Sequence, residues 1–277
     1  MKRRIDLHTH SDKSDGTLSP AELARAAKAE GLCAVALTDH DTNSGIAEFM
    51  SECERLGIEG IGGIEISTDF PRLLHIVGLY PHGAEYERAV EKLKNARLER
   101  NLKMLGRIYD EFGITDEEIL SGTGATAESC GRLHMANAIV KRGYAESVSD
   151  AFERYLKRGR LCYVEKFSLS PEDSVKLIKD CGGIAVWAHP VSAVDTEEEM
   201  LETARHMMAA GLDAMECMYN NFTPSQSEMC RRVAAKAGLL QSGGSDFHGS
   251  NKPEVRLGAV SEGFVPYEIL QRLKQTI

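Results

Sequence analysis

The stretch Asp6-Leu-His-Thr-His10, followed by Ser14-Asp-Gly16, constrains the fold of this chain more than any other feature. We predict a short buried strand over 5–10 that carries both histidines at its end. Side chains two positions apart on a strand point to the same face, so His8 and His10 face one point in space. Such a pair can bind a metal ion, and Asp15 in the following loop can add an oxygen ligand. The alternative is two ordinary histidines near a terminus, because an H-x-H pair alone is weak evidence.

Predicted strands and helices alternate along most of the chain. Helices begin where a capping residue precedes a proline, at Ser19-Pro20, Ser170-Pro171 and Thr223-Pro224. This alternation predicts a parallel sheet closed into a barrel. A helical block interrupts it, with helices over 84–112, 133–142 and 149–158. The other strands are expected at 34–39, 59–67, 73–80, 183–189, 214–219, 239–246 and near 255–260.

The composition excludes several classes of protein. No apolar run is long enough to span a bilayer, and no signal-peptide stretch follows the start, so we expect a cytoplasmic protein without a membrane partner. A net charge of −9 argues against a stable DNA partner, although bound cations would still allow an anionic substrate. The seven cysteines include no C-x-x-C pair and are interpreted as reduced core residues.

Residues that bind metals recur at the predicted strand ends. In barrels of this type the functional residues lie at the carboxyl ends of the strands. Any one of these side chains could be a buried histidine or a surface acid, but all of them together favour a shared site. The set is His8, His10, Asp15, Asp39, His40, Glu65, His75, His189, Asp246 and His248.

Six motifs in this order resemble the PHP (polymerase and histidinol phosphatase) family over nearly the whole chain. They are DLHTH…SDG, TDHD, GIEIS, HIVGLY, AHP and GSDFHG. The chain is most similar to the stand-alone phosphoesterase branch, whose helical insertion carries an arginine-rich helix and a GRPH element. Here these read Arg97-Leu-Glu-Arg-Asn101 and Gly131-Arg-Leu-His134, and Leu133 in place of proline loosens the expected turn.

The resemblance implies a distorted, TIM-like (β/α)7 barrel of the PHP fold with an inserted helical domain. Residues 1–83 and 161–277 would form the metal-binding barrel, and 84–160 the insertion that covers the active site. The family pattern implies one ion on His8, His10, Glu65 and Asp246, a second on Asp15, His40 and His248, and a third on Glu65, His75 and His189, with Glu65 bridging.

The implied activity is hydrolysis of phosphate esters with two or three divalent ions as cofactors. Imidazole and carboxylate ligands suit Mn, Fe or Zn better than Mg. Such ions would ionise a bridging water, and the hydroxide would attack phosphorus. Asp39 and His189 are candidates to protonate the leaving oxygen, although Asp39 could instead orient His40. Asp6 either supports the ligands from behind or pairs with Arg3 or Arg4.

The insertion is expected to select the substrate. It holds 14 Lys and Arg against 13 Asp and Glu, whereas the remainder holds 19 against 29. Arg97, Arg100 and Asn101 lie on one helical stripe, and Arg132 and His134 open the next helix. We predict that they bind a second phosphate. The expected substrate is a small phosphorylated molecule: a nucleoside 3′,5′-bisphosphate losing its 3′-phosphate, or a short 5′-phosphorylated oligoribonucleotide.

Other interpretations stay open at this point. The same chemistry could act on histidinol phosphate or another small phosphomonoester. An amidohydrolase-type barrel that cleaves C–N bonds also begins with H-x-H, but it usually has a bridging lysine at a strand end, which the sequence lacks. A non-catalytic metal-binding module is a further alternative. Tyr219 and Asn220 end another strand, where they could contact a base or ribose or simply pack.

Overall fold

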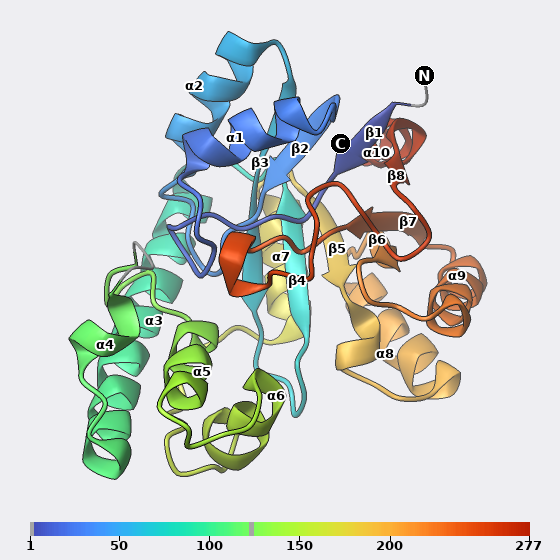
Figure 1. Cartoon of the computed structure of the whole chain (residues 1–277). Coiled ribbons are helices and arrows are strands. Elements are labelled where there is room, and N and C mark those ends of the chain that lie inside the picture. Colours follow the sequence, from blue (N-terminus) through green and yellow to red (C-terminus); the bar gives the residue numbers. More distant parts are fainter. Residues whose placement is uncertain (1–2, 122–124) are drawn as a thin grey trace.

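Eight strands form one mixed sheet that nearly closes into a barrel in the computed structural model of this chain, which describes residues 3–121 and 125–277 (Figure 1). The strand order is β7-β6-β5-β4-β3-β2-β1-β8. Past the ends of β1 and β7 the chain segments meet, because His10 N–H donates to Phe247 O and Asp246 N–H donates to His8 O, both at 2.9 Å. The strands are β1 (Arg4–Asp6), β2 (Ala34–Leu37), β3 (Glu59–Ser67), β4 (His75–Leu79), β5 (Ile184–Ala188), β6 (Ala214–Tyr219), β7 (Leu240–Gly244) and β8 (Val265–Pro266).

The direction of β4 departs from the prediction. It runs antiparallel to both β3 and β5, whereas a parallel sheet was expected; β8 is likewise antiparallel to β1. A hairpin-like connection over 68–74 joins β3 to β4 directly, and such a short link permits only antiparallel pairing. As a result His75, the first residue of β4, lies opposite Ser67, the last residue of β3. The barrel itself is confirmed.

Helices cover the outside of the sheet (Figure 1). On β2, Ala34 and Ala36 face the barrel interior while Val35 and Leu37 pack under the first two helices, which explains its unbroken apolar sequence. The predicted caps at Ser19, Ser170 and Thr223 each accept a hydrogen bond from the first helical turn. All seven cysteines are unpaired, and all but Cys33 are buried. The helices are α1 (Pro20–Ala29), α2 (Ile46–Leu56), α3 (Ala84–Phe112), α4 (Asp116–Leu120), α5 (Arg132–Lys141), α6 (Val148–Ala151), α7 (Pro171–Asp180), α8 (Glu197–Ala209), α9 (Pro224–Ala237) and α10 (Tyr267–Leu273).

The long helix α3 links the barrel to the helical block. Its first half packs with the barrel helices through Val90 and Leu93, and its second half joins a separate core through Leu105 and Ile108. Helices α4, α5 and α6 gather beside this second half in Figure 1. The division at 84 and 160 stays a prediction, and its residues 1–2 and 122–124 lie outside the described chain.

Two predicted strands differ in the structure. The first ends at Asp6 instead of residue 10, because the next residues pair only through isolated bonds, such as Thr38 N–H to Thr9 O. The strand near 255–260 was wrong: Gly258 has a φ of +74° and interrupts the extended chain, and β8 follows it. Within the described chain, no helix has the length and apolar character needed to cross a membrane.

Candidate metal centre

The nine predicted metal ligands lie together at one end of the barrel, and all except the half-buried His40 are buried. His8, His10 and Asp15 follow β1, and His40 follows β2. Glu65 lies within β3, His189 follows β5, and Asp246 and His248 follow β7. His75 joins them from the start of β4, since the reversed strand brings its amino end to this edge. The rule that functional residues follow the carboxyl ends of strands therefore fails for this one ligand.

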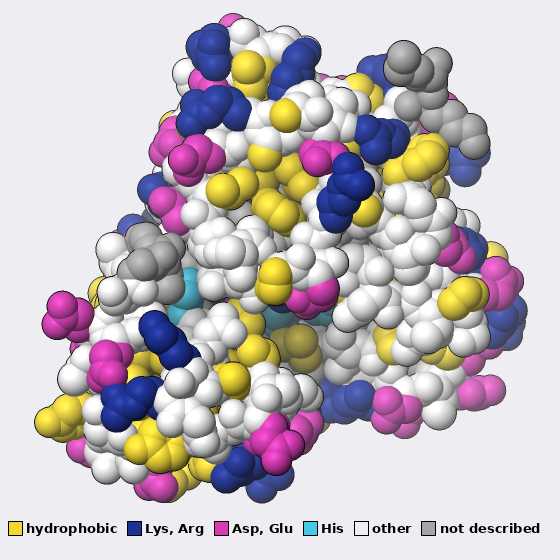
Figure 2. Space-filling view, in the orientation of Figure 1, with side chains coloured by type: hydrophobic (Ala, Val, Ile, Leu, Met, Phe, Trp, Pro, Cys, Tyr) yellow, Lys and Arg dark blue, Asp and Glu magenta, His cyan; other side chains and the backbone are white. Residues whose placement is uncertain are grey.

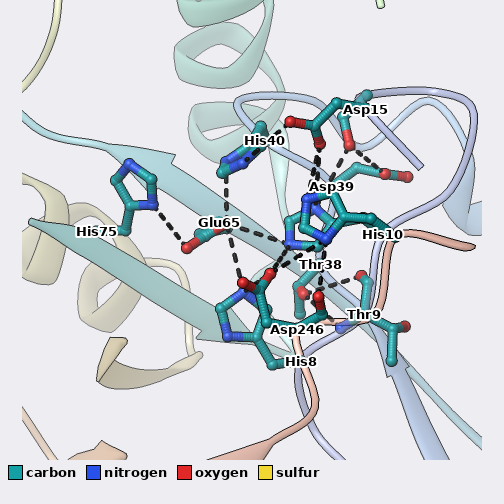
Figure 3. Close-up of polar contacts among 12 residues, drawn as sticks. His8, Thr9, His10, Asp15, Thr38, Asp39, His40, Glu65, His75 and Asp246 are labelled. Carbon is teal, nitrogen blue, oxygen red and sulfur yellow. Dashed lines mark hydrogen bonds and ion pairs between the residues drawn. The ribbon is translucent and has the colours of Figure 1, made fainter. Parts of the chain in front are cut away.

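Glu65 occupies the middle of the cluster, with histidines on several sides (Figure 3). Its two oxygens face different imidazoles, so it is placed to bridge. Oε2 lies 3.3 Å from His8 Nε2, 3.3 Å from His10 Nε2 and 2.9 Å from His40 Nδ1, and Oε1 lies 2.7 Å from His75 Nδ1 and 2.9 Å from His189 Nε2.

Asp15 and Asp246 complete the cluster from two loops. Asp15 Oδ1 lies 3.1 Å from His248 Nε2, and Asp246 Oδ1 lies 3.1 Å from His10 Nε2. The donor atoms form overlapping groups, within each of which all lie inside 4.8 Å of one another. These groups are His8, His10, Glu65 and Asp246; His10, Asp15, His40 and His248; and His40, Glu65 and His75.

The donor atoms fit a metal centre because several of them are buried without a hydrogen-bond partner. A buried polar atom without a hydrogen bond is uncommon in a folded protein and costs free energy. Here five such atoms converge, and divalent ions bound among the three groups would satisfy them. They are His8 Nε2, His10 Nε2, Asp15 Oδ1, His40 Nδ1 and Glu65 Oε2.

The electrostatics of the cluster keep its carboxylates ionised. Burial would raise the pKa of Glu65, but the imidazoles of His40, His75 and His8 hold it well below its usual range. Burial lowers the pKa of His75 to about 4, so this imidazole is neutral and available as a ligand near pH 7.

His8 behaves differently. Burial alone would lower its pKa, but the carboxylates of Glu65 and Glu216 raise it well above the ordinary value. In the metal-free protein a proton therefore competes for this ligand.

Glu216 is a residue of this centre that the sequence analysis missed. It lies on β6 and is buried. Its Oε1 is 2.9 Å from His8 Nδ1, and its Oε2 accepts the His189 N–H at 2.6 Å. It thereby orients two predicted ligands from behind. The available signal was a lone carboxylate within the otherwise apolar strand sequence Ala-Met-Glu-Cys-Met.

Asp39 and Asp6 hold the loops that carry ligands. Asp39 accepts hydrogen bonds from Ser11 N–H at 2.8 Å and Ser14 Oγ at 2.6 Å, which fixes the turn leading to Asp15. Among the described residues, its carboxylate bonds to these serines and not to the His40 imidazole. Asp6 accepts from Ser245 N–H and Gly258 N–H rather than pairing with Arg3 or Arg4. Both carboxylates are buried.

Tyr219 and Asn220 contact the segment that bears Asp246. Tyr219 OH donates to Asp246 Oδ2 at 2.5 Å, and its ring packs edge-on against His189. The Asn220 amide donates to Ser245 O. Of the two, Tyr219 also lines the cavity described next.

A cavity of about 650 Å³ opens above the cluster, between the barrel and the helical block. Figure 2 shows histidine atoms at the bottom of a hollow beside the lobe formed by α4–α6. Asp15, His40, Glu65, Asp246 and His248 are on its floor, together with His75 and His189. Its cationic wall consists of Arg97, Arg100, Arg132 and Lys166.

The cationic wall has few negative partners. Asp41 Oδ2 lies 3.1 Å from Arg97 Nη1 and 3.2 Å from Lys166 Nζ, and no carboxylate of the described residues pairs with Arg100. Burial, with repulsion from Arg97 and Arg132, lowers the pKa of Arg100 to about 9. Excess positive charge of this kind favours an anionic ligand.

Two of the five predicted substrate-binding residues, Asn101 and His134, are not among the residues that line this cavity, and their part in substrate binding stays a prediction. The Asn101 amide donates to Ala127 O and Cys130 O, since it closes the loop before α5. His134 Nδ1 accepts the Gly131 N–H and so caps that helix. The Asn101 amide nitrogen thus binds backbone carbonyls, and the two ring nitrogens of His134 contact the Gly131 N–H and the Asn251 side-chain amide, each at 3.0 Å.

Comparisons with known proteins agree with this geometry. The family model described as PHP domain matches residues 6–165. The chain is 35% identical over 251 residues to a 5′-3′ exoribonuclease of Haemophilus influenzae (90% of this chain, 91% of the relative) and 34% identical over 251 residues to a 3′,5′-nucleoside bisphosphate phosphatase of Chromobacterium violaceum (88% and 87%). A crystal structure from Bifidobacterium adolescentis, assigned as a metal-dependent phosphoesterase, superposes with a TM-score of 0.81 at 30% identity and covers 99% of this chain and 96% of its own.

Proposed function

The chain belongs to the PHP domain family and is a metal-dependent phosphoesterase, and from this premise we propose that it removes the 3′-phosphate from nucleoside 3′,5′-bisphosphates. The observation that carries the choice of substrate is the cationic wall facing the metal centre across one cavity. A substrate with two phosphates can place one on each side, whereas a simple phosphomonoester such as histidinol phosphate would leave the wall unmatched. The named activities of the two curated relatives, an exoribonuclease and a nucleoside bisphosphate phosphatase, favour phosphate esters over the C–N bonds of the amidohydrolase alternative.

The metal ligands of this proposal are the nine predicted residues. We assign the ions to the three groups that the family pattern implies, with Glu65 bridging, and to Mn, Fe or Zn rather than Mg. Bound there, divalent ions supply Lewis-acid stabilisation of charge on the phosphoryl oxygens and lower the pKa of water.

The remaining side chains bind and orient. Arg97, Arg100 and Arg132 hold the 5′-phosphate, since guanidinium groups match phosphate geometry and are held here without full neutralisation. Binding of the 5′-phosphate by these arginines holds the 3′-phosphate over the metal ligands, so the substrate reacts from one bound orientation. Glu216 keeps His8 in the tautomer that presents Nε2 to the centre.

Asp39 and His189 were the candidates for proton transfer to the leaving oxygen. We propose that Asp39 positions the Ser11–Asp15 turn instead, because Ser11 and Ser14 already occupy both of its oxygens. For His189 we propose ligation through Nε2, and its role in proton transfer stays a prediction.

Short 5′-phosphorylated oligoribonucleotides are the second candidate substrate, favoured by the named activity of the Haemophilus relative. The same anchor would then bind the 5′ end of the RNA while the first phosphodiester lies over the metals. Both substrates therefore depend on the same three arginines.

The test is Arg132→Ala, assayed on adenosine 3′,5′-bisphosphate, on a 5′-phosphorylated oligoribonucleotide and on p-nitrophenyl phosphate. A lost charge-assisted contact should lower kcat/KM on the two anchored substrates about 10- to 100-fold and leave p-nitrophenyl phosphate nearly unchanged. Arg55→Ala, an exposed arginine on α2, is the matched control. Equal losses on all three substrates would contradict the anchor.

A further inference from the structure

Lys252 lies at the metal centre, although no sequence motif drew attention to it. It directly follows the short 3-10 turn η3 (Gly249–Asn251), lines the cavity and has a side chain that is 27% exposed. Its Nζ lies 2.6 Å from Asp246 Oδ2. This ammonium therefore borders both a proposed metal ligand and the space that the substrate occupies.

The backbone that carries Lys252 is fixed to the loop of another ligand. Ser250 N–H donates to Thr17 Oγ1 at 2.9 Å, and the Asn251 side-chain amide donates to Asp15 O at 2.9 Å. These bonds tie the 249–252 segment to the turn after β1. The position of the Lys252 ammonium is therefore fixed by the backbone, and a group that contacts a reacting phosphate needs such a fixed position.

The two oxygens of Asp246 have separate tasks. Oδ1 faces the imidazoles, at 3.1 Å from His10 Nε2, whereas Oδ2 accepts from Tyr219 OH and from Lys252. An ammonium has three N–H donors, and within the described residues Asp246 is the single side chain that Lys252 contacts. Two donors are left for a ligand in the cavity.

Charge balance points the same way. The proposed ligands include three carboxylates, of Asp15, Glu65 and Asp246, and two divalent ions would more than neutralise them. With the ions bound, the carboxylates no longer need Lys252 as a counter-ion, and its charge adds to the net positive charge of the metal centre. A phosphate dianion is the ligand that such a centre attracts.

We propose that Lys252 is a further substrate-binding residue, whose ammonium contacts a non-bridging oxygen of the phosphate that is hydrolysed. The inference rests on the phosphoesterase activity and the proposed metal ligands, but not on the nucleotide substrate. It assigns Lys252 to the scissile phosphate, and the arginine wall to the second one.

The experiment compares Lys252→Met, Lys252→Arg and the control Lys176→Met, which removes an exposed lysine that pairs with Asp180 on α7. Metal content, inhibition by inorganic phosphate, and kcat/KM on p-nitrophenyl phosphate and adenosine 3′,5′-bisphosphate are measured for each. We expect Lys252→Met to keep its metal, to bind inorganic phosphate about tenfold more weakly, and to lose about 10- to 100-fold in kcat/KM on both substrates alike. Lys252→Arg should recover a large part of the loss.

Two results would overturn the inference. Loss of metal from Lys252→Met would show that the lysine serves only to position Asp246, and unchanged inhibition by phosphate would show that it does not touch the phosphate. The outcome is independent of the proposed nucleotide specificity: if adenosine 3′,5′-bisphosphate is not a substrate at all, the effects on p-nitrophenyl phosphate and on inorganic phosphate still decide the role of Lys252.

Discussion

Replacing Glu216 by glutamine tests whether the residue behind the ligands controls metal binding. The carboxylate accepts from His8 Nδ1 through one oxygen and from His189 N–H through the other. A glutamine offers a single oxygen, so its NH2 group must face one of these two donors. If it faces His8, the imidazole has to carry its proton on Nε2, the atom that points at Glu65.

The size of the effect follows from the bond that is lost. Glu216 is buried, and the charge-assisted hydrogen bond that it accepts from His8, which is lost when the glutamine NH2 faces this imidazole, contributes about 1.5–3 kcal/mol. A loss of about 1.4–2.8 kcal/mol corresponds to about 10- to 100-fold weaker metal binding, the range typical of residues that orient metal ligands.

The assay is competition for Mn²⁺ against a chelator, for the wild type, Glu216→Gln and the control Glu197→Gln. Glu197 pairs with Arg232 and Lys236 at the surface, away from the centre. Urea denaturation in excess chelator separates metal affinity from the stability of the fold. A folded Glu216→Gln protein that binds Mn²⁺ within about threefold of the wild type would refute the orienting role.

Two further predictions concern charge. Arg100→Met should stabilise the ligand-free protein by about 1 kcal/mol and raise its Tm by about 2–4 °C, because the charged guanidinium is buried beside Arg97 and Arg132. Added phosphate should stabilise the wild type more than the variant. A Tm of the ligand-free variant below that of the wild type would contradict the prediction. The raised pKa of His8 predicts opposite pH dependences with and without metal. In excess chelator, the stability that the ion pairs of His8 contribute is fully present below about pH 6.5 and is lost as the pH rises through the folded-state pKa. With Mn²⁺ bound, the stability should instead rise over the same pH range, because His8 must be deprotonated to bind the metal. Urea-denaturation profiles that run parallel with and without Mn²⁺ would contradict the prediction.

Much of the metal centre could be predicted from sequence because its ligands sit where periodicity is strongest. His40 and His189 follow the buried apolar strands β2 and β5, and the strands of a barrel deliver their ends to one place. Glu216 was not predicted, because a single carboxylate inside an apolar strand has the same sequence pattern whether it orients a histidine or pairs with another group. Lys252 escaped because it lies in an irregular segment, whose path depends on bonds to Thr17 Oγ1 and Asp15 O that no local pattern encodes.

The strand direction illustrates the same limit. The sequence of β4 is apolar and short, and such a strand pairs equally well in either direction, so only the length of the 68–74 connection indicated the reversal. The helical stripe of α3 was likewise predictable, and it places Arg97 and Arg100 in the cavity. Which polar atoms are left free was not predictable, because the Asn101 amide binds backbone carbonyls that belong to a loop 26–29 residues away.

The contacts of Asp41 fix the distance between the metal centre and the cationic wall, and this distance would select substrates by the separation of their two phosphates. Its Oδ1 accepts the Ser67 N–H at the end of β3, the strand that carries Glu65, and its Oδ2 meets Arg97 from α3 and Lys166 from the segment before α7. One buried carboxylate thus connects the bridging ligand's strand to the cationic wall. Since each link is a direct contact of this buried carboxylate, Arg97 and Lys166 cannot shift far from the predicted metal ligands without breaking these contacts. A fixed spacing between the metal centre and the cationic wall would then select substrates whose two phosphates match that spacing. A substrate with its phosphates closer together or farther apart would lose the contact with the arginines, even though every binding group is present.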